Sequence, residues 1–138
     1  MAALPALNDI FEEYELLDGE DRYRLLIDLG RKLEPMPDVL KTDATKVPGC
    51  AASVWVYPQR GADGRLHFLA DSNAAITKGI VALVLAAVQD RPAEEVARMD
   101  VAAALAPFDL SRQLSANRTQ GIPSMIELVR DTAQRLAA

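Results

Sequence analysis

The sequence contains one cysteine, Cys50, and one histidine, His67, among its 138 residues. A single cysteine excludes an internal disulfide framework and any metal or iron–sulfur site built only from cysteines. One histidine added to it is still too few ligands for a closed metal site. We therefore predict that the chain holds no metal and no cofactor of its own. A lone cysteine also fits a reducing, intracellular compartment.

Long apolar runs and an excess of positive charge are also missing. The most apolar stretch, residues 80–88, is far shorter than the roughly 20 residues that cross a bilayer. The N-terminus is acidic and has no basic segment, so we expect a cytoplasmic protein with no signal peptide and no membrane association. The 15 basic and 20 acidic residues give a formal net charge of −5. This balance argues against nucleic-acid binding, because such binding depends on Lys and Arg neutralising phosphates.

The composition is that of an ordinary globular protein, with 50% hydrophobic and 25% charged residues. We expect residues 1–138 to form a single domain around one core. Helix should predominate, because the chain carries 23 alanines and 18 leucines.

The spacing of apolar residues predicts where the helices and strands lie. We expect helices over residues 4–17, 23–33, 74–89 and 92–99, and a last helix that begins near Asn117. The second should stop at Pro35 and Pro37, and residues 71–73 should cap the third. We expect strands over 53–57 and 65–70, a short strand near 46–47, and an irregular or short helical segment over 101–114, broken at Pro107. This order predicts an α+β fold, a small antiparallel sheet packed against helices.

Cys50 lies in a predicted loop that leads into the first strand. Pro48 and Gly49 should bend the backbone there, and Ala51 and Ala52 crowd it little. Such a loop can present a sulfur atom to another molecule. The alternative is that Cys50 is a buried thiol that acts as a small hydrophobic residue.

Three other residues are candidates with ordinary alternatives. Arg118 is predicted at the entrance of the last helix, where a cation opposes the helix dipole. This placement favours a tertiary partner, either an acid or a thiolate, and the alternative is a surface arginine or an ordinary salt bridge. Trp55 is either a partner-binding anchor or a core residue. His67 falls on the more polar face of its strand, which favours a solvated or merely packed histidine over a Cys–His catalytic pair.

Three motifs together resemble the SufE family of sulfur acceptors. They are Gly49-Cys50-Ala51-Ala52-Ser53-Val54-Trp55, Ala70-Asp71-Ser72-Asn73-Ala74-Ala75-Ile76-Thr77-Lys78-Gly79 and Leu114-Ser115-Ala116-Asn117-Arg118-Thr119-Gln120-Gly121-Ile122. They occur in the order and at the separations of that family. Asn73 stands where the family usually has Asp, Gln113 where His is common, and Ala116 where Pro is usual. These departures concern the partner surface.

The resemblance implies a fold similar to IscU-type scaffolds, and a role in sulfur transfer. SufE-like proteins take persulfide sulfur from a SufS-like cysteine desulfurase, which carries pyridoxal phosphate (PLP). They stimulate that enzyme and pass the sulfur to an iron–sulfur scaffold complex. The implied carrier is Cys50, the implied supporting residue is Arg118, and the implied partner contacts are Gly49, Ala51, Ala52, Trp55, Asp71 and Asn73.

Two other functions remain open at this stage. The chain could be a non-catalytic interaction module on the same scaffold, which has no need of Cys50. It could also be a redox sensor, although no second cysteine is present to resolve a sulfenic acid.

For a sulfur carrier we expect a gated loop, whose thiol rests protonated against apolar side chains and swings out when a partner docks.

Overall fold

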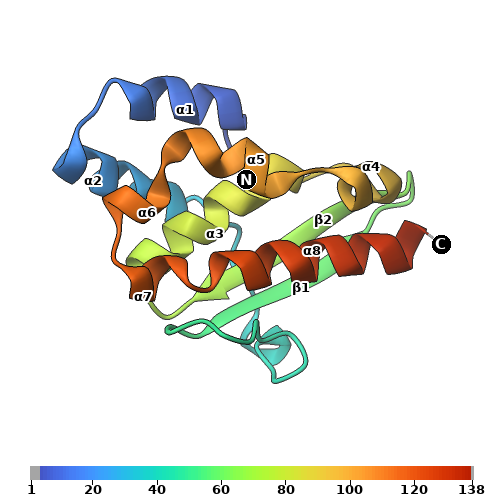
Figure 1. The fold of residues 1–138 in the computed structure, drawn as a ribbon. Helices are drawn as coiled ribbons and strands as arrows, with labels where there is room; N and C mark the ends of the chain where they lie inside the picture. The colour runs from blue at the N-terminus through green and yellow to red at the C-terminus, as the bar shows by residue number, and fades with distance from the viewer. Residues whose placement is uncertain (1–3, 138) are drawn as a thin grey trace.

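The structure is a computed structural model that describes residues 4–137. Helices and strands follow one another in the order α1 (Leu7–Glu15), α2 (Gly19–Gly30), η1 (Asp38–Leu40), β1 (Val54–Arg60), β2 (Arg65–Ser72), α3 (Ala75–Val88), β3 (Arg91–Pro92), α4 (Ala93–Arg98), α5 (Val101–Leu105), η2 (Ala106–Phe108), α6 (Leu110–Gln113), α7 (Ala116–Thr119) and α8 (Ile122–Ala137). The predicted α+β class is confirmed (Figure 1).

The sheet is antiparallel and has the strand order β1-β2-β3. Val56 pairs with Ala70 and Pro58 with Phe68, which places the alternating apolar residues of both strands on the inner face. The alternation predicted for β2 is therefore confirmed. Trp55 pairs with Asp71 on the opposite face and is only half-buried. The interpretation of Trp55 as a core residue was wrong, because Val54 and Val56 on either side of it occupy the inner face.

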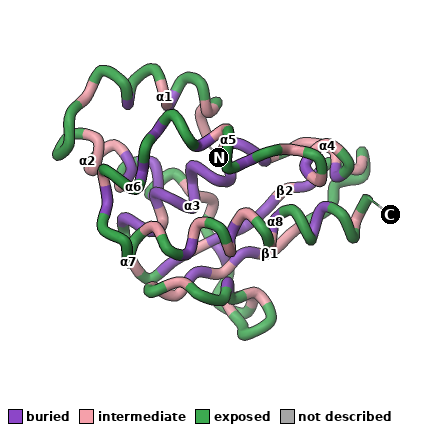
Figure 2. Tube along the Cα trace, in the orientation of Figure 1, coloured by how far each residue is buried: buried purple, intermediate pink, exposed green. Residues whose placement is uncertain are grey.

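Helix α3 is the centre of the molecule, and nearly every residue from Ile76 to Val88 is buried (Figures 1 and 2). Helix α2 lies directly on its first half. A Cβ atom on Gly79 would overlap the backbone of Leu26, and one on Gly30 would come within 2.7 Å of the Gly79 nitrogen. Glycine at both positions lets the two backbones touch.

The segment after α5 is fixed to α1 by an aromatic cluster. The Tyr14 hydroxyl donates a hydrogen bond of 2.7 Å to the Phe108 carbonyl oxygen. The Phe108 ring also lies 5.3 Å from the ring of Phe11, edge to face. Pro107 lies inside η2 and breaks the helical segment, as its sequence position predicts.

Several boundaries differ from those predicted. Helix α2 ends at Gly30, five residues before Pro35, and its last carbonyls are satisfied by a tight turn. Residues 71–73 do not cap α3 with a side chain, because β2 continues to Ser72 and the N-cap is Ala74. The strand expected at residues 46–47 is a single bridge between Lys46 and Trp55. The short β3 was not predicted. No helix within residues 4–137 is long and apolar enough to cross a membrane.

Candidate functional site

Cys50 lies at the tip of a loop whose two ends are fastened. Val47 and Val54 are buried, and the Val47 amide donates a hydrogen bond of 2.8 Å to the Val54 carbonyl, which closes the base. The Ser53 amide donates to Asn73 Oδ1 at 3.1 Å, and the Asn73 amide donates to the Ser53 carbonyl. Residues 48–52 carry no such hydrogen bonds to the sheet, and Cys50 instead contacts Gly121, just before α8.

Gly49 gives the loop its bend. Its φ angle is +79°, in the left-handed region that favours glycine. A Cβ on Gly49 would lie 3.3 Å from Ser124 Oγ, so the loop runs along the first turn of α8. The predicted bend at Pro48 and Gly49 agrees with this geometry. The side chains of Ala51 and Ala52 are exposed and half-exposed, respectively.

The thiol itself faces the start of α8. Cys50 Sγ lies 3.9 Å from the Gly121 carbonyl oxygen, a distance that suits a weak S–H···O hydrogen bond. Gly121 is buried, and a Cβ on it would overlap Cys50 Sγ. The side chain is partly buried against the hydrophobic core. Burial raises the pKa of the Cys50 thiol above its usual range, so the resting form is protonated.

A cluster of charged groups fastens the neighbouring elements. The Asp71 carboxylate accepts from Lys41 Nζ at 2.6 Å and from Lys78 Nζ at 3.2 Å. Lys41 Nζ also lies 5.8 Å from the centre of the Trp55 ring. Burial alone would raise the pKa of Asp71, but hydrogen bonds from Lys41, from the Ser72 amide and from Lys78 lower it. Asp71 therefore links the end of β2 to the segment after η1 and to the start of α3. Asn73, just after β2, links the Cys50 loop to the same end of the strand.

Arg118 does not stand at the entrance of the last helix. It belongs to α7, a short helix that is separate from α8, and it lies in the last turn of α7, where a cation does not oppose the dipole. The dipole argument for a tertiary partner therefore rested on a wrong boundary. The Arg118 side chain is exposed, and its guanidinium carbon lies 5.9 Å from the centre of the Tyr23 ring. Gly121 follows it closely, at the end of the same motif.

His67 is neither free in solvent nor near the thiol. Its Nδ1 lies 2.7 Å from Asp90 Oδ1 and its Nε2 lies 3.0 Å from Glu34 Oε1. Ser72 pairs with Val54 at the loop end of the sheet, and His67 lies five residues from Ser72, or roughly 17 Å along the strand. This placement rules out a Cys50–His67 catalytic pair. Of the two ordinary roles predicted for His67, solvated or merely packed, the structure shows the packed one, because the ring is held between two carboxylates.

The structure adds contacts to the thiol that sequence reasoning did not single out. Gly121 and Ser124 lie against the loop, and the third motif contains Gly121 without indicating this contact. The position of Gly121, just before the apolar pattern of the last helix, is the sequence signal that another segment packs closely against the backbone there. Residues 4–137 contain no group of three or more His, Cys, Asp or Glu side chains arranged to hold a metal ion.

Comparison with known proteins places this arrangement in a family. Residues 8–133 match the family model described as SufE, an Fe-S metabolism associated domain. The chain is 35% identical over 139 aligned positions to an uncharacterized SufE-like protein of Rhizobium etli, covering 98% of this chain and 94% of that protein. It is 36% identical over 135 positions to an uncharacterized SufE-like protein of Rhizobium meliloti, covering 95% and 96%.

A solved structure shares the fold. The solution structure of a hypothetical protein from Thermus thermophilus superimposes with a TM-score of 0.76 and covers 98% of each chain, at 16% sequence identity. The match over residues 8–133 and the identity to the two relatives confirm the family that the three motifs indicated. The chain belongs to the SufE family, whose domain is associated with iron–sulfur metabolism.

Proposed function

We propose that this protein accepts persulfide sulfur on Cys50 from a SufS-like, PLP-containing cysteine desulfurase, stimulates that enzyme, and passes the sulfur to an iron–sulfur scaffold complex. The observation that carries the proposal is the placement of the chain's one thiol. Cys50 lies at the tip of a loop that is fastened at its base by Val47, Val54 and Asn73. A buried structural cysteine does not need such a loop.

The transfer is a thiol–disulfide exchange in which no net oxidation occurs. The Cys50 thiolate attacks the outer sulfur of the donor persulfide, and a new S–S bond forms at Cys50. The S–S bond of the donor breaks, and the donor cysteine leaves as a thiolate. The proton that Cys50 gives up balances the one that the donor thiolate takes up. Cys50 then carries the persulfide.

The resting geometry protects the thiol but does not activate it. Burial raises its pKa, and its hydrogen-bond partner is the Gly121 carbonyl oxygen, which would repel a thiolate. The activating environment therefore has to come from the partner, after the loop has left α8. A partner shifts the loop only if it binds the open state more tightly than the closed one. Because the base is fastened, the motion is confined to residues 48–52.

Mass spectrometry of the intact protein after incubation with a desulfurase and cysteine tests the proposal. The wild-type protein should gain the mass of one or more sulfur atoms, which a reductant removes. Cys50→Ser should fold normally and gain none. As a matched control, Cys50→Ser combined with Ala51→Cys moves the thiol to a neighbouring exposed position, where loading should be much weaker.

The same experiment distinguishes the interaction-module alternative. A regulatory module without sulfur transfer would leave the wild-type mass unchanged, while Cys50→Ser would still alter desulfurase turnover. Equal sulfur loading of wild type and Cys50→Ser would disprove the carrier role of Cys50.

A further inference from the structure

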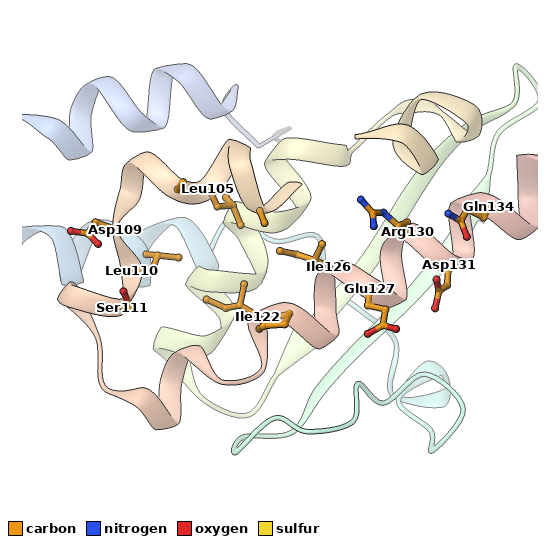
Figure 3. Close-up of a pocket in the computed structure, with 13 residues that line it drawn as sticks. Leu105, Asp109, Leu110, Ser111, Ile122, Ile126, Glu127, Arg130, Asp131 and Gln134 are labelled. Carbon is orange, nitrogen blue, oxygen red and sulfur yellow. The ribbon is translucent and has the colours of Figure 1, made fainter. Parts of the chain in front are cut away.

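Two of the hollows in residues 4–137 differ in how their walls are held. The larger, of about 680 Å³, separates α8 from α5, η2 and α6, and both of its walls are helical (Figure 3). The smaller, of about 270 Å³, lies between β2, the end of α3 and the chain segments 4–6 and 32–34. Residues 32–34 belong to no helix or strand. This wall of the smaller hollow therefore depends on side-chain contacts to stay in place.

The smaller hollow combines an apolar interior with charged groups nearer the solvent. The buried part of its lining consists of Phe68, Ala70 and Leu85. The charged part consists of Lys32, Glu34, His67 and Asp90. Opening the wall would thus expose apolar side chains to water.

His67 ties the wall to the corner between α3 and β3. Its Nε2 lies 3.0 Å from Glu34 Oε1 on the wall, and its Nδ1 lies 2.7 Å from Asp90 Oδ1 at the corner. A carboxylate oxygen can only accept a hydrogen bond, so each contact needs an N–H on the ring. The imidazolium ion has two N–H groups and the neutral ring has one. Both contacts can therefore be hydrogen bonds only while His67 is protonated.

When the ring loses its proton, Asp90 is the partner that keeps its hydrogen bond. Asp90 makes the shorter contact, and its backbone is fixed at a φ angle of +59°. Its amide donates to the Leu66 carbonyl at 2.8 Å, and its carbonyl accepts from Arg65 Nη1 at 2.9 Å. Glu34 has the longer side chain, and within residues 4–137 its backbone makes no hydrogen bond to another segment. The neutral ring then turns a bare Nε2 lone pair toward the Glu34 carboxylate, and the two repel each other.

We propose that His67 is a pH-operated latch on residues 32–34. The imidazolium ion holds Glu34 and closes the smaller hollow. Loss of the proton releases Glu34 and opens this wall.

The charged groups around the ring set the direction of the switch. Glu34 and Asp90 favour the protonated ring, whereas Lys32 on the wall and Arg65 on β2 oppose it. The side chains of Gln59, opposite on β1, and Gln89, at the end of α3, are uncharged. Burial lowers the pKa of His67, but the hydrogen bonds with Asp90 and Glu34 outweigh it and raise the pKa. The latch is therefore closed below this raised pKa and opens as the pH rises through it.

The release ends before η1. Met36 is buried, and Lys41 is held by Asp71 at 2.6 Å. The Lys32 and Leu33 amides donate to carbonyls at the end of α2, at 3.0 and 3.2 Å, and these are the bonds that the open state weakens. The latch thus acts on the hollow and not on the thiol loop, and it can be tested without a desulfurase.

Amide exchange with water, measured by NMR on the ¹⁵N-labelled full chain at pH about 5.5 and about 8.5, tests the latch. Each rate is compared with that of the unstructured chain at the same pH. Protection of the Lys32 and Leu33 amides should fall about threefold to fivefold at the higher pH, as suits a partly exposed pair. Protection within α3 should not change. Because His67 is the only histidine, the ¹⁵N shifts of its ring identify the neutral tautomer, which should carry its proton on Nδ1.

Glu34→Gln separates a latch from an ordinary ion pair. A carboxamide both donates and accepts, so it can bond the bare Nε2 of the neutral ring as well as the imidazolium ion. The wall should then stay protected at both pH values. Asp90→Asn should act in the same way at the other nitrogen, because Asn also adopts the left-handed conformation and leaves the single N–H for Glu34. His67→Phe should leave the wall released at both pH values, and Glu12→Gln, at an exposed position on α1, should behave as the wild type.

Several results would overturn the proposal. One is wild-type protection of Lys32 and Leu33 that is the same at both pH values. Another is a loss of protection at high pH that persists in both Glu34→Gln and Asp90→Asn. A neutral wild-type ring with its proton on Nε2 would also overturn it, because Asp90 and not Glu34 would then be the partner released.

Discussion

Cys50 Sγ lies against the α-carbon of Gly121, at a point where no other residue type leaves room for the sulfur atom. The contact joins two positions that are 71 residues apart, one in the loop before β1 and the other just before α8. The absence of a side chain at Gly121 thus sets the resting position of the thiol. The predicted protonated state of Cys50 agrees with its raised pKa, whereas its opening remains a prediction.

We predict that Gly121→Ala drives the Cys50 loop outward in the free protein. The added methyl group overlaps the sulfur in the closed state only, so opening relieves the strain. A relief of about 1.4 kcal/mol would raise the alkylation rate of Cys50 by iodoacetamide about tenfold. Overpacking should also lower the free energy of unfolding by about 1–3 kcal/mol.

Gly19→Ala is the matched control, because a Cβ at Gly19 meets nothing within 4 Å. Its alkylation rate should equal that of the wild type. In the wild type, Cys50 should react far more slowly than in the unfolded chain. Wild-type Cys50 that already reacts as fast as the denatured chain would mean that the loop is permanently open.

Protonation of His67 should stabilise the fold below neutral pH. Burial alone would lower the pKa of His67, but its hydrogen bonds with Asp90 and Glu34 outweigh burial and raise it. The stabilisation is fully present below the unfolded pKa of about 6.5 and is lost as the pH rises through the folded pKa. His67→Gln should therefore lower the free energy of unfolding more at pH about 5.5 than at pH about 8.5. The difference should be less than about 1 kcal/mol, because both ion pairs are partly exposed. Urea unfolding at both pH values measures the difference, and an equal cost at both would exclude the ion pairs as its source.

Local chemistry in the sequence accounts for much of the fold. The break predicted at Asp18 and Gly19 lies where α2 begins, with Asp18 as its N-cap, and the turn at residues 61–64 joins β1 to β2. The alternation of Leu66, Phe68 and Ala70 identified the inner face of β2. The same alternation in Val54 and Val56 would also have placed Trp55 on the outer face.

The contacts that define the site are the part that local patterns do not contain. The packing of Gly121 on Cys50 and the bridging of Lys41 and Lys78 by Asp71 depend on how distant segments meet. The family motifs indicated these residues without indicating their contacts. The split between α7 and α8 was missed because the helical spacing of Met125 and Val129 hides the break at Gly121.

Asp71→Asn should loosen the segment after η1 from the sheet. The variant replaces a carboxylate that accepts hydrogen bonds from two ammonium groups, which should cost about 1.5–3 kcal/mol of unfolding free energy. Because the folded pKa of Asp71 is lowered, its contribution is present above the unfolded pKa of about 3.9 and is lost as the pH falls through the folded value. Asp38→Asn, which removes an exposed partner of Lys41, should cost less than about 0.5 kcal/mol. Urea unfolding near neutral pH compares the two, and equal costs would mean that Asp71 does not hold the segment.

Arg118→Ala should lower sulfur transfer more than it lowers stability. The guanidinium is exposed and rests on the Tyr23 ring, a contact worth only about 0.5–1 kcal/mol to the fold. Its charge stands on α7, shortly before Gly121, and is available to a docked desulfurase. Loss of a partner contact of about 1.4 kcal/mol would slow transfer about tenfold.

Single-turnover mass spectrometry with a persulfide-loaded desulfurase measures this rate, and iodoacetamide alkylation of the free variant should match the wild type. Arg118→Lys should retain part of the rate, and Arg112→Ala, which removes an exposed arginine on α6, should retain all of it. An Arg118→Ala rate equal to that of the wild type would reduce Arg118 to a surface residue packed on Tyr23.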